Sequence, residues 1–454
     1  MKKQDMKQLL LTQNPRELMF KLAVPGIIGM VVIGLYPFMD GVFAGWIIGD
    51  YAMSSISISM SLTLINGAIA ALIGIGSASI LSRAIGKNDK ETIDKIFGNL
   101  SYWVIIFSII ITIFGVIFAS KFLELVGAKG AIKTLGIRYL RIVFLGSIFV
   151  NFAQAGNMTM RGEGALKQSM LIMGAGALLN IILDPIFMYL MGKHAIEGAA
   201  IATVISQIVQ AILTFCYFSK KSEFIKINKI KKSMNLTLEM FSIGSSAMMM
   251  QLLFAVQQAF LFKQAFKYGG SDWGILMSAT MRLYMFSFIP LWGMSQGLQP
   301  VIGTNFGAKQ YSRVKQTMKI FVYGATLLAA ISWIPSMFFS EKLLSLFNVR
   351  SQILDTNVWL FRLFYSVFIL YGIMIMSLTF FQSVGDAKKA GMVVIMRQLV
   401  LFVPAVLILP KLFGSVAVWW AQPIVDFFMI LICFVLQQKQ LIKICDDKKR
   451  AVVK

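Results

Sequence analysis

Long apolar segments recur along the whole sequence and decide what it can fold into. Windows of about 19 residues pick out twelve of them, each long enough to cross a bilayer core of roughly 30 Å as a helix. Backbone polar groups find no water there, so helices that satisfy their own hydrogen bonds are favoured. The sequence therefore predicts an all-α integral membrane protein with twelve transmembrane helices. The approximate limits are 17–45, 54–82, 97–119, 135–158, 169–191, 196–218, 237–264, 275–305, 316–339, 357–381, 392–412 and 415–437.

The positively charged residues lie mainly in the segments that connect the spans and in the two tails. The chain carries a formal net charge of +23, which by itself would be compatible with nucleic-acid binding. Most of the lysines and arginines, however, lie in the two tails and in the loops after even-numbered spans, as at Arg83, Lys87 and the run 220–232. This asymmetry is typical of cytoplasmic loops, so both termini are predicted to be cytoplasmic. The expected partner is the lipid bilayer and not a nucleic acid.

Several chemistries are disfavoured by what the sequence lacks. No GxxxxGK[ST] motif is present, which argues against an ATP-driven pump. The single histidine, His194, lies in a short loop, so a histidine-based metal centre or proton relay is excluded. The three cysteines imply no disulfide framework. The apolar stretch from Leu22 onward is longer than a signal-peptide core and is interpreted as a retained first helix.

Acidic residues inside the apolar segments are rare. Of the twenty acids, only Asp40, Asp184 and Asp426 lie well within spans. A carboxylate at the centre of a bilayer costs about 2.5–3.5 kcal/mol on insertion scales and by default marks an ion or proton site. Asn180 lies four residues before Asp184, on the same helical face. We therefore expect Asp40 and Asp184 to share a dry pocket and to exchange charge during transport.

Structural roles remain open for Asp184 and Asp426. Asp184 would be purely structural if it paired with a buried arginine such as Arg141. Asp426 is more simply explained as the counter-ion of Arg397 than as a coupling residue. Arg282 and Arg362 are candidates for similar internal counter-ions.

The two halves of the chain repeat each other. A displacement of 221 residues aligns Gly76, Ser82 and Gly86 with Gly297, Gly303 and Gly307, and the same displacement relates 18–20 to 239–241 and 164–165 to 385–386. Six spans in each half make these parallel repeats, related by an axis along the membrane normal. The prediction is a lobe of residues 1–220, a cytoplasmic linker 221–236 and a lobe 237–454 with a basic tail. The alternative is a repeat kept for packing alone.

Five motifs resemble the multidrug and toxic compound extrusion (MATE) family, a branch of the superfamily that also contains lipid-linked oligosaccharide flippases. The strongest is Gly-Leu-Gln-Pro-Val-Ile-Gly-Thr-Asn-Phe-Gly-Ala after the eighth span. The five segments are 297–308, 74–89, 161–164, 180–185 and 198–203. The resemblance implies two pseudo-symmetric six-helix bundles and export of organic compounds against an inflow of protons or sodium.

The resemblance also implies where the ion site lies. The chain is most similar to the prokaryotic branch whose ion site is in the N-terminal lobe, and the matching positions are Asp40, Asn180, Asp184 and Thr203. Asn180 and Thr203 would supply neutral oxygens, also to sodium if that is the ion. The norfloxacin-exporter branch instead carries acids on its seventh and tenth helices. Here 247–262 has none, and the tenth span has none after Asp355, which argues against a site in the second lobe.

The resemblance also suggests residues that would line the cavity for the transported compound and prolines at which the first helix would bend. Met is flexible and aromatic faces attract cations, which suits an adaptable cavity, although most such residues in a membrane protein simply face lipid or other helices. Proline removes a helical hydrogen bond and permits a kink. The cavity candidates are Tyr36, Tyr139, Gln154, Asn157 and Met173, and the hinge candidates are Pro25 and Pro37.

The function expected from the sequence is secondary active antiport. The chain would export organic, mainly cationic, compounds from a bacterial cytoplasm in exchange for protons or sodium, with no cofactor beyond that ion, as a monomer in the plasma membrane. The alternative is a lipid-linked oligosaccharide flippase, which would have a wide cationic cleft and often two further helices. An intramembrane enzyme would need a nucleophile with a base or a metal cluster, and a channel would need acid rings along a pore.

Overall fold

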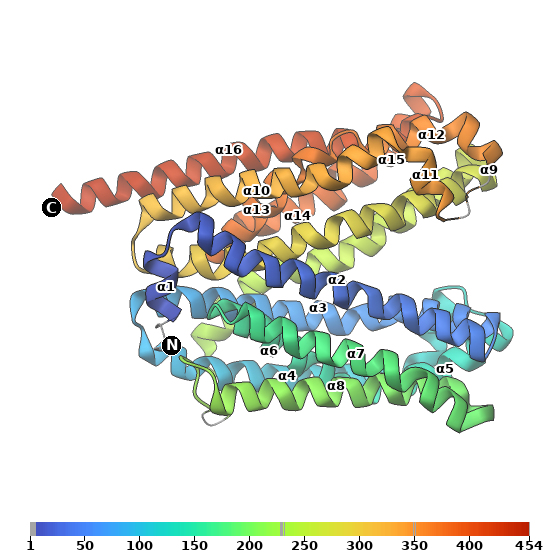
Figure 1. Cartoon of the computed structure of the whole chain (residues 1–454), viewed down its shortest axis with the longest axis horizontal. Coiled ribbons are helices and arrows are strands. Elements are labelled where there is room, and N and C mark those ends of the chain that lie inside the picture. The colour runs from blue at the N-terminus through green and yellow to red at the C-terminus, as the bar shows by residue number, and fades with distance from the viewer. Residues whose placement is uncertain (1–5, 228–229, 231, 348, 350, 454) are drawn as a thin grey trace.

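The structure is built of helices. The computed structural model describes residues 6–227, 230, 232–347, 349 and 351–453, and only the backbone at 35–38, 41, 50 and 445–453. Within these residues there is no β-strand (Figure 1). The side chains of Tyr36 and Pro37, both named above, lie outside the described residues.

The first half of the chain forms one bundle. A short helix, α1 (Met6–Thr12), precedes α2 (Pro15–Ile47), and the half ends with α8. Helices α5 and α6 meet at a 57° bend and make one span between them. The remaining helices are α3 (Asp50–Lys87), α4 (Lys90–Leu125), α5 (Gly130–Leu145), α6 (Ser147–Gly162), α7 (Leu166–Met191), the 3₁₀ turn η1 (Gly192–His194) and α8 (Ala195–Lys220).

The second half forms a second bundle. Its first helix, α9 (Met234–Gly307), turns back at Gly270, whose φ of 62° interrupts the helix, so that α9 has two arms. Two later spans are each built from shorter helices, one through a 3₁₀ turn and one through a π-helical segment. The remaining elements are α10 (Tyr311–Phe338), α11 (Ser340–Ser345), α12 (Ser351–Tyr365), η2 (Phe368–Leu370), α13 (Tyr371–Val384), α14 (Ala387–Ile395), the π segment η3 (Met396–Leu401), α15 (Phe402–Phe413) and α16 (Ala417–Val453).

The described residues contain the predicted number of spans. Ten apolar stretches are long enough to cross a membrane when α5 and α6 are counted together. Two of these stretches cross twice, because the 55 residues 166–220 contain both α7 and α8 and the 74-residue α9 has two arms. Twelve spans result, and the prediction of an all-α, twelve-helix membrane protein is confirmed.

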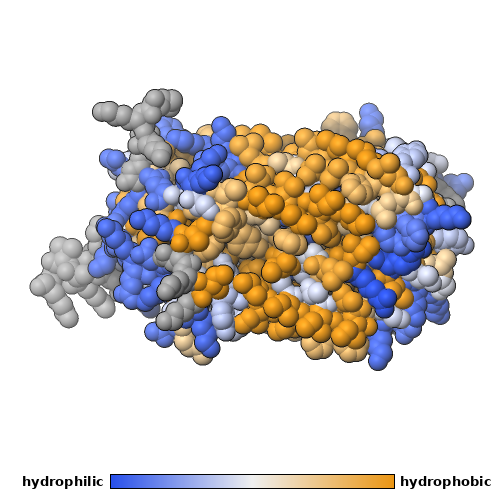
Figure 2. Space-filling model, turned by 90° about the horizontal axis from the view of Figure 1, so that it is seen from below, coloured by the Kyte–Doolittle hydropathy of each residue, from blue (hydrophilic) through white to orange (hydrophobic). Residues whose placement is uncertain are grey.

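The surface fits a bilayer. Figure 2 shows a broad hydrophobic belt between two hydrophilic ends. Large apolar side chains such as Ile113, Ile117 and Ile331 are exposed on this surface. An apolar surface of this extent is unfavourable in water and is expected where lipid chains cover it.

Each bundle has its own hydrophobic core. The largest core cluster consists almost wholly of residues from α9 onward, whereas two smaller clusters lie among α2 to α8. A further cluster joins helices of the first half to Leu236, Met240 and Ile243 at the start of α9. In Figure 1 the blue-to-green helices accordingly form one bundle and the yellow-to-red helices the other. That the two bundles tilt as separate units stays a prediction.

The bundles contact each other mainly at the end of the molecule where both chain termini lie, here called the terminal end (Figure 1). Glycines let the backbones approach closely there. A Cβ atom on Gly26 of α2 would lie 2.5 Å from the carbonyl oxygen of Gly293, and one on Gly86 would lie 2.2 Å from that of Thr304. An ion pair between Arg83 of α3 and Glu239 of α9, 2.8 Å long, adds to this contact.

Candidate ion site in the first bundle

Two carboxyl groups meet inside the first bundle. Asp40 from α2 is 2% exposed and Asp184 from α7 is fully buried, and they lie close enough to repel each other electrostatically. Helices α2 and α7 pack along each other, which brings residues 144 positions apart in sequence into one pocket. The hydroxyl group of Tyr139 on α5 donates a hydrogen bond to Asp40 Oδ2 over 3.2 Å.

Neutral oxygens complete the site. Asn180 is one helical turn before Asp184, and its Nδ2 donates to Asp184 Oδ1 over 2.9 Å. The same amide nitrogen donates to Thr203 Oγ1 on α8 over 3.3 Å. The four positions expected from the sequence, Asp40, Asn180, Asp184 and Thr203, are therefore brought together by three helices.

Several oxygens of this site have no partner. Asp40 Oδ1, Asn180 Oδ1 and Asp184 Oδ2 are buried without a hydrogen bond from any described residue. The ion pairs formed by the described residues include neither aspartate, and Arg141 is exposed. The alternative pairing of Asp184 with Arg141 is thus wrong, because Arg141 lies on the outer face of α5. Two uncompensated carboxylates in a bilayer favour uptake of a proton or a cation.

A small cavity adjoins the site. It has a volume of about 70 Å³ and is lined by Asn180 and Thr203 together with Gln154, Met173 and Gln207, among others. This space suits one or two water molecules or a small ion rather than a drug-sized compound. Gln207, whose buried Oε1 has no described partner, was not identified from the sequence. Its spacing of four residues from Thr203, on the same helical face, is the signal that would have found it.

The residues predicted to line the cavity for the transported compound lie in different parts of the first bundle. Gln154 and Met173 line the cavity, whereas Tyr139 instead holds Asp40. Asn157 is buried outside this cavity, where its Nδ2 donates to Ala153 O over 2.8 Å and to Thr214 Oγ1 over 3.1 Å. The contacts made by cargo itself stay predictions.

The first predicted hinge proline lies at the contact between bundles. Pro25 directly precedes Gly26, where α2 touches Gly293 of α9. Helix α2 runs unbroken through positions 25 and 37. Bending at Pro25 or Pro37 stays a prediction.

The acid in the second bundle has a different environment. Arg397 Nε donates to Asp426 Oδ1 over 2.7 Å, and both side chains are buried, which confirms the predicted pair. The prediction that Arg282 and Arg362 are internal counter-ions is wrong. Both are exposed, and Arg362 Nε donates to Ser340 Oγ over 2.8 Å.

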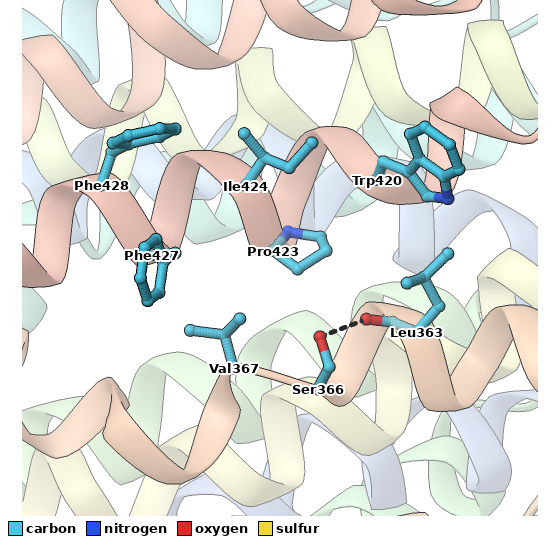
Figure 3. Close-up of a pocket in the computed structure, with 8 residues that line it drawn as sticks. All are labelled: Leu363, Ser366, Val367, Trp420, Pro423, Ile424, Phe427 and Phe428. Atoms are coloured by element: carbon cyan, nitrogen blue, oxygen red, sulfur yellow. Dashed lines mark hydrogen bonds between the residues drawn. The ribbon is translucent and has the colours of Figure 1, made fainter. Parts of the chain in front are cut away.

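A larger pocket in the second bundle carries no charge. It has a volume of about 310 Å³ and lies between α16 and the end of α12 (Figure 3). Leu363, Val367, Pro423 and Phe427 are among its lining residues. Its one hydroxyl group, on Ser366, donates to the carbonyl of Leu363 over 2.8 Å. This pocket therefore offers no group that could bind an ion.

Comparisons with known proteins agree with the fold and the repeat. The model of the MatE family matches twice, at residues 25–186 and 246–408. Multidrug export protein MepA of Staphylococcus aureus is 25% identical over 413 residues, 90% of each chain. A crystal structure of MATE in the bent conformation superposes with a TM-score of 0.91 at 25% identity, covering 98% of this chain and 99% of the other.

A solved structure of a transporter with a bound compound is also similar to this chain. The MATE multidrug transporter DinF-BH, solved with a bound compound, has a TM-score of 0.86 and 30% identity, and the match covers 93% of this chain and 95% of that one. Together, the two matched halves, the twelve spans and these likenesses along almost the whole chain show that this protein is a membrane transporter, not an enzyme, and belongs to the MatE family.

Proposed function

We propose that this protein is a secondary active multidrug exporter that exchanges organic, chiefly cationic, compounds for protons or sodium ions. The observation that carries the proposal is the pair of buried carboxyl groups, Asp40 and Asp184, that no described cation neutralises. The names of its relatives, a multidrug export protein and a multidrug transporter, support export rather than glycolipid flipping.

The proposed cycle follows from charge. With the site empty, two carboxylates in a low-dielectric pocket repel each other, and loading with a proton or sodium removes this repulsion. The ion therefore favours the conformation of the first bundle in which the two acids lie closest, and loss of the ion favours a conformation in which they lie farther apart. A ligand shifts such an equilibrium only by its difference in affinity between the two states. A cationic compound would offset the same negative charge, so its binding competes with that of the ion.

The proposed orientation follows from the basic segments. The ends of α3 and α8 lie at the terminal end (Figure 1), and basic residues such as Lys87 and Lys220 belong to them, so we place this end in the cytoplasm of a bacterial cell. The close glycine contacts there keep the described arrangement shut on that side. This state would accept ions from, and release cargo to, the outside. We further propose that the protein works as a monomer.

The test is efflux of a fluorescent organic cation from cells or its transport by proteoliposomes, under an imposed pH gradient and then a sodium gradient. The variants are Asp184→Asn and Asp40→Asn, which keep the side-chain shape. Ion-driven transport is expected to fall at least tenfold in each, because an amide cannot take up a proton or pair with a cation in this role.

The matched control is Asp272→Asn, which neutralises an exposed acid near the Gly270 break. It should transport as the unmodified protein does. Full gradient-driven transport by both buried-site variants would contradict the proposal. Whichever gradient drives transport in the unmodified protein identifies the coupling ion.

A further inference from the structure

The second bundle contains a buried polar network centred on Asp426. Its carboxylate accepts hydrogen bonds from Arg397 Nε and from Gln422 Nε2, each over 2.7 Å, and the hydroxyl group of Tyr284 lies 3.5 Å away. Gln257 donates in turn to Gln422. The guanidinium of Arg397 lies 5.3 Å from the ring centre of Tyr371. The carboxylate of Asp426 thus has a cation and hydrogen-bond donors around it, and within the network Gln257 Oε1 is buried without a described partner.

Apart from Tyr284, which lies on the second arm of α9, this network uses the helices that correspond to those of the ion site. In the first bundle the site is built from the first, fourth, fifth and sixth spans, on α2, α5, α7 and α8. In the second bundle Gln257 belongs to the first span, Tyr371 to the fourth, Arg397 to the fifth and Asp426 to the sixth. The same part of the repeat therefore carries polar groups in both bundles.

The 221-residue displacement makes the correspondence closer. It relates Arg397 to Gly176 and Tyr371 to Val150, and both of these first-bundle residues line the small cavity beside Asn180 and Thr203. Where the first bundle has a glycine at the cavity wall, packed against the side chain of Gln210, the second bundle has an arginine. Arg397 lies in the π-helical segment, and such segments redirect side chains at functional sites.

The two sites differ in how their negative charge is balanced. Asp40 and Asp184 have no cation among the described residues, whereas Asp426 has the guanidinium of Arg397 in contact. A buried carboxylate whose cationic partner is removed becomes strongly unfavourable in its charged form. It then gains by taking up a proton or a cation.

We propose that Arg397 is a tethered cation that occupies the second bundle's counterpart of the ion cavity. In this role it is a positioning residue, which keeps Asp426 neutralised in every step of the cycle. The coupling ion is then bound by the first bundle alone. The inference rests on the proposed ion coupling at Asp40 and Asp184, and it adds that removing Arg397 creates a second ion site.

The experiment measures the melting temperature of purified protein between pH 5 and 8, with and without sodium. All variants carry Asp40→Asn, Asp184→Asn and Glu163→Gln, so that none of the buried acids of the first bundle titrates in this range. The other titratable side chains that face the network, Tyr284, Tyr371 and Cys433, belong to types that ordinarily titrate above this range. A dependence that appears on changing Arg397 therefore reports Asp426.

With Arg397→Gln, the melting temperature is expected to fall at pH 8 and to recover at pH 5 or on adding sodium. The further change Asp426→Asn should restore it at pH 8 and abolish both dependences, because no buried charge remains. The matched control is Arg362→Gln, which removes an exposed arginine and should show no such dependence.

Two results would overturn the inference. One is a melting temperature of the Arg397→Gln variant that depends on neither pH nor sodium. The other is a variant with Arg397→Gln and Asp426→Asn that melts as low as Arg397→Gln alone, which would show that the arginine acts through packing. Either result leaves the proposed coupling at Asp40 and Asp184 standing, since that is tested by transport in a chain with a native second bundle.

Discussion

At the scale of single residues, the partner of a buried acid decides what the acid can do. Asp184 and Asp426 are both buried acids within membrane spans. Asp426 touches an arginine and two amide or hydroxyl groups, whereas Asp184 receives one hydrogen bond from a neutral amide. Asp426 is therefore neutralised within the protein, whereas Asp184 has no cation among the described residues, which is the basis for proposing that it takes up an ion.

Replacing Thr203 by valine tests the neutral oxygens of the site. Thr203→Val keeps the shape of the side chain but removes the oxygen that accepts from Asn180. A hydrogen bond of this kind contributes about 1 kcal/mol, so the affinity for the coupling ion should fall roughly fivefold. The measurement is the ion concentration that gives half-maximal transport in proteoliposomes. Thr203→Ser, which keeps the oxygen, serves as the control, and equal values for the two variants would contradict the assigned role.

Glu163 gives a prediction about pH outside the spans. It lies between α6 and α7, where burial raises its pKa to about 7 although Tyr217 and Ser222 donate hydrogen bonds to it. An acid with a raised pKa in the folded protein stabilises the fold below its unfolded value, near 4.5, and this contribution is lost as pH rises through about 7.

The change Glu163→Gln should therefore flatten the loss of stability between pH 5 and 8. Glutamine keeps the shape and can accept from the Tyr217 hydroxyl group without becoming charged. The melting temperature of the variant should exceed that of the unmodified protein at pH 8 and change less with pH. Glu17→Gln, on the first turn of α2, is an exposed control. A pH profile of Glu163→Gln that coincides with that of the unmodified protein would show that Glu163 does not titrate in this range.

At the scale of helices, glycines determine where the bundles meet. Gly26 and Gly293 face each other where α2 crosses the second arm of α9. Small residues at such crossings allow the backbones to pack closely, which is the main source of helix association in a membrane. A side chain at either position would push the helices apart.

A pair of alanine substitutions tests this crossing. Gly26→Ala would place a Cβ atom 2.5 Å from the Gly293 carbonyl oxygen, whereas at Gly174 the nearest atom outside its own helix would be 3.9 Å away. Overpacking costs about 1–3 kcal/mol, so Gly26→Ala should lower the melting temperature. Gly174→Ala, which removes a flexible glycine from a helix, should leave it unchanged or raise it. Equal melting temperatures would mean that the two helices separate freely at this point.

The helices also show how far the sequence could be interpreted. Apolar length predicts the twelve spans well, because a bilayer requires it, and the Asn180–Asp184 spacing predicts one face of the site. Packing against neighbouring helices decides which side of a helix faces outward, and the sequence alone does not show it. The structure places the side chains of three arginines, Arg141, Arg282 and Arg362, on exposed sides. The π-helical segment that carries Arg397 could not be predicted from the pattern of apolar residues, because it differs from an α-helix only in its local backbone hydrogen bonds.

At the scale of the whole molecule, the two bundles share an architecture but differ in charge. The family model matches each half once, yet among the described residues only the first half contains buried carboxyl groups without a cationic partner. In the proposed cycle, the first bundle binds the coupling ion and moves against the second bundle, which binds none. The close contacts at the terminal end then define one of its two states.

The most direct measurement is the distance between spin labels on the two bundles. Lys87→Cys and Lys309→Cys place labels at exposed positions on either side of the terminal-end contact, in a chain whose three cysteines are replaced. The account predicts that changing pH or sodium redistributes this distance between a short and a long value, and that Asp40→Asn with Asp184→Asn abolishes the response. The same redistribution in the variant without these acids would contradict the account.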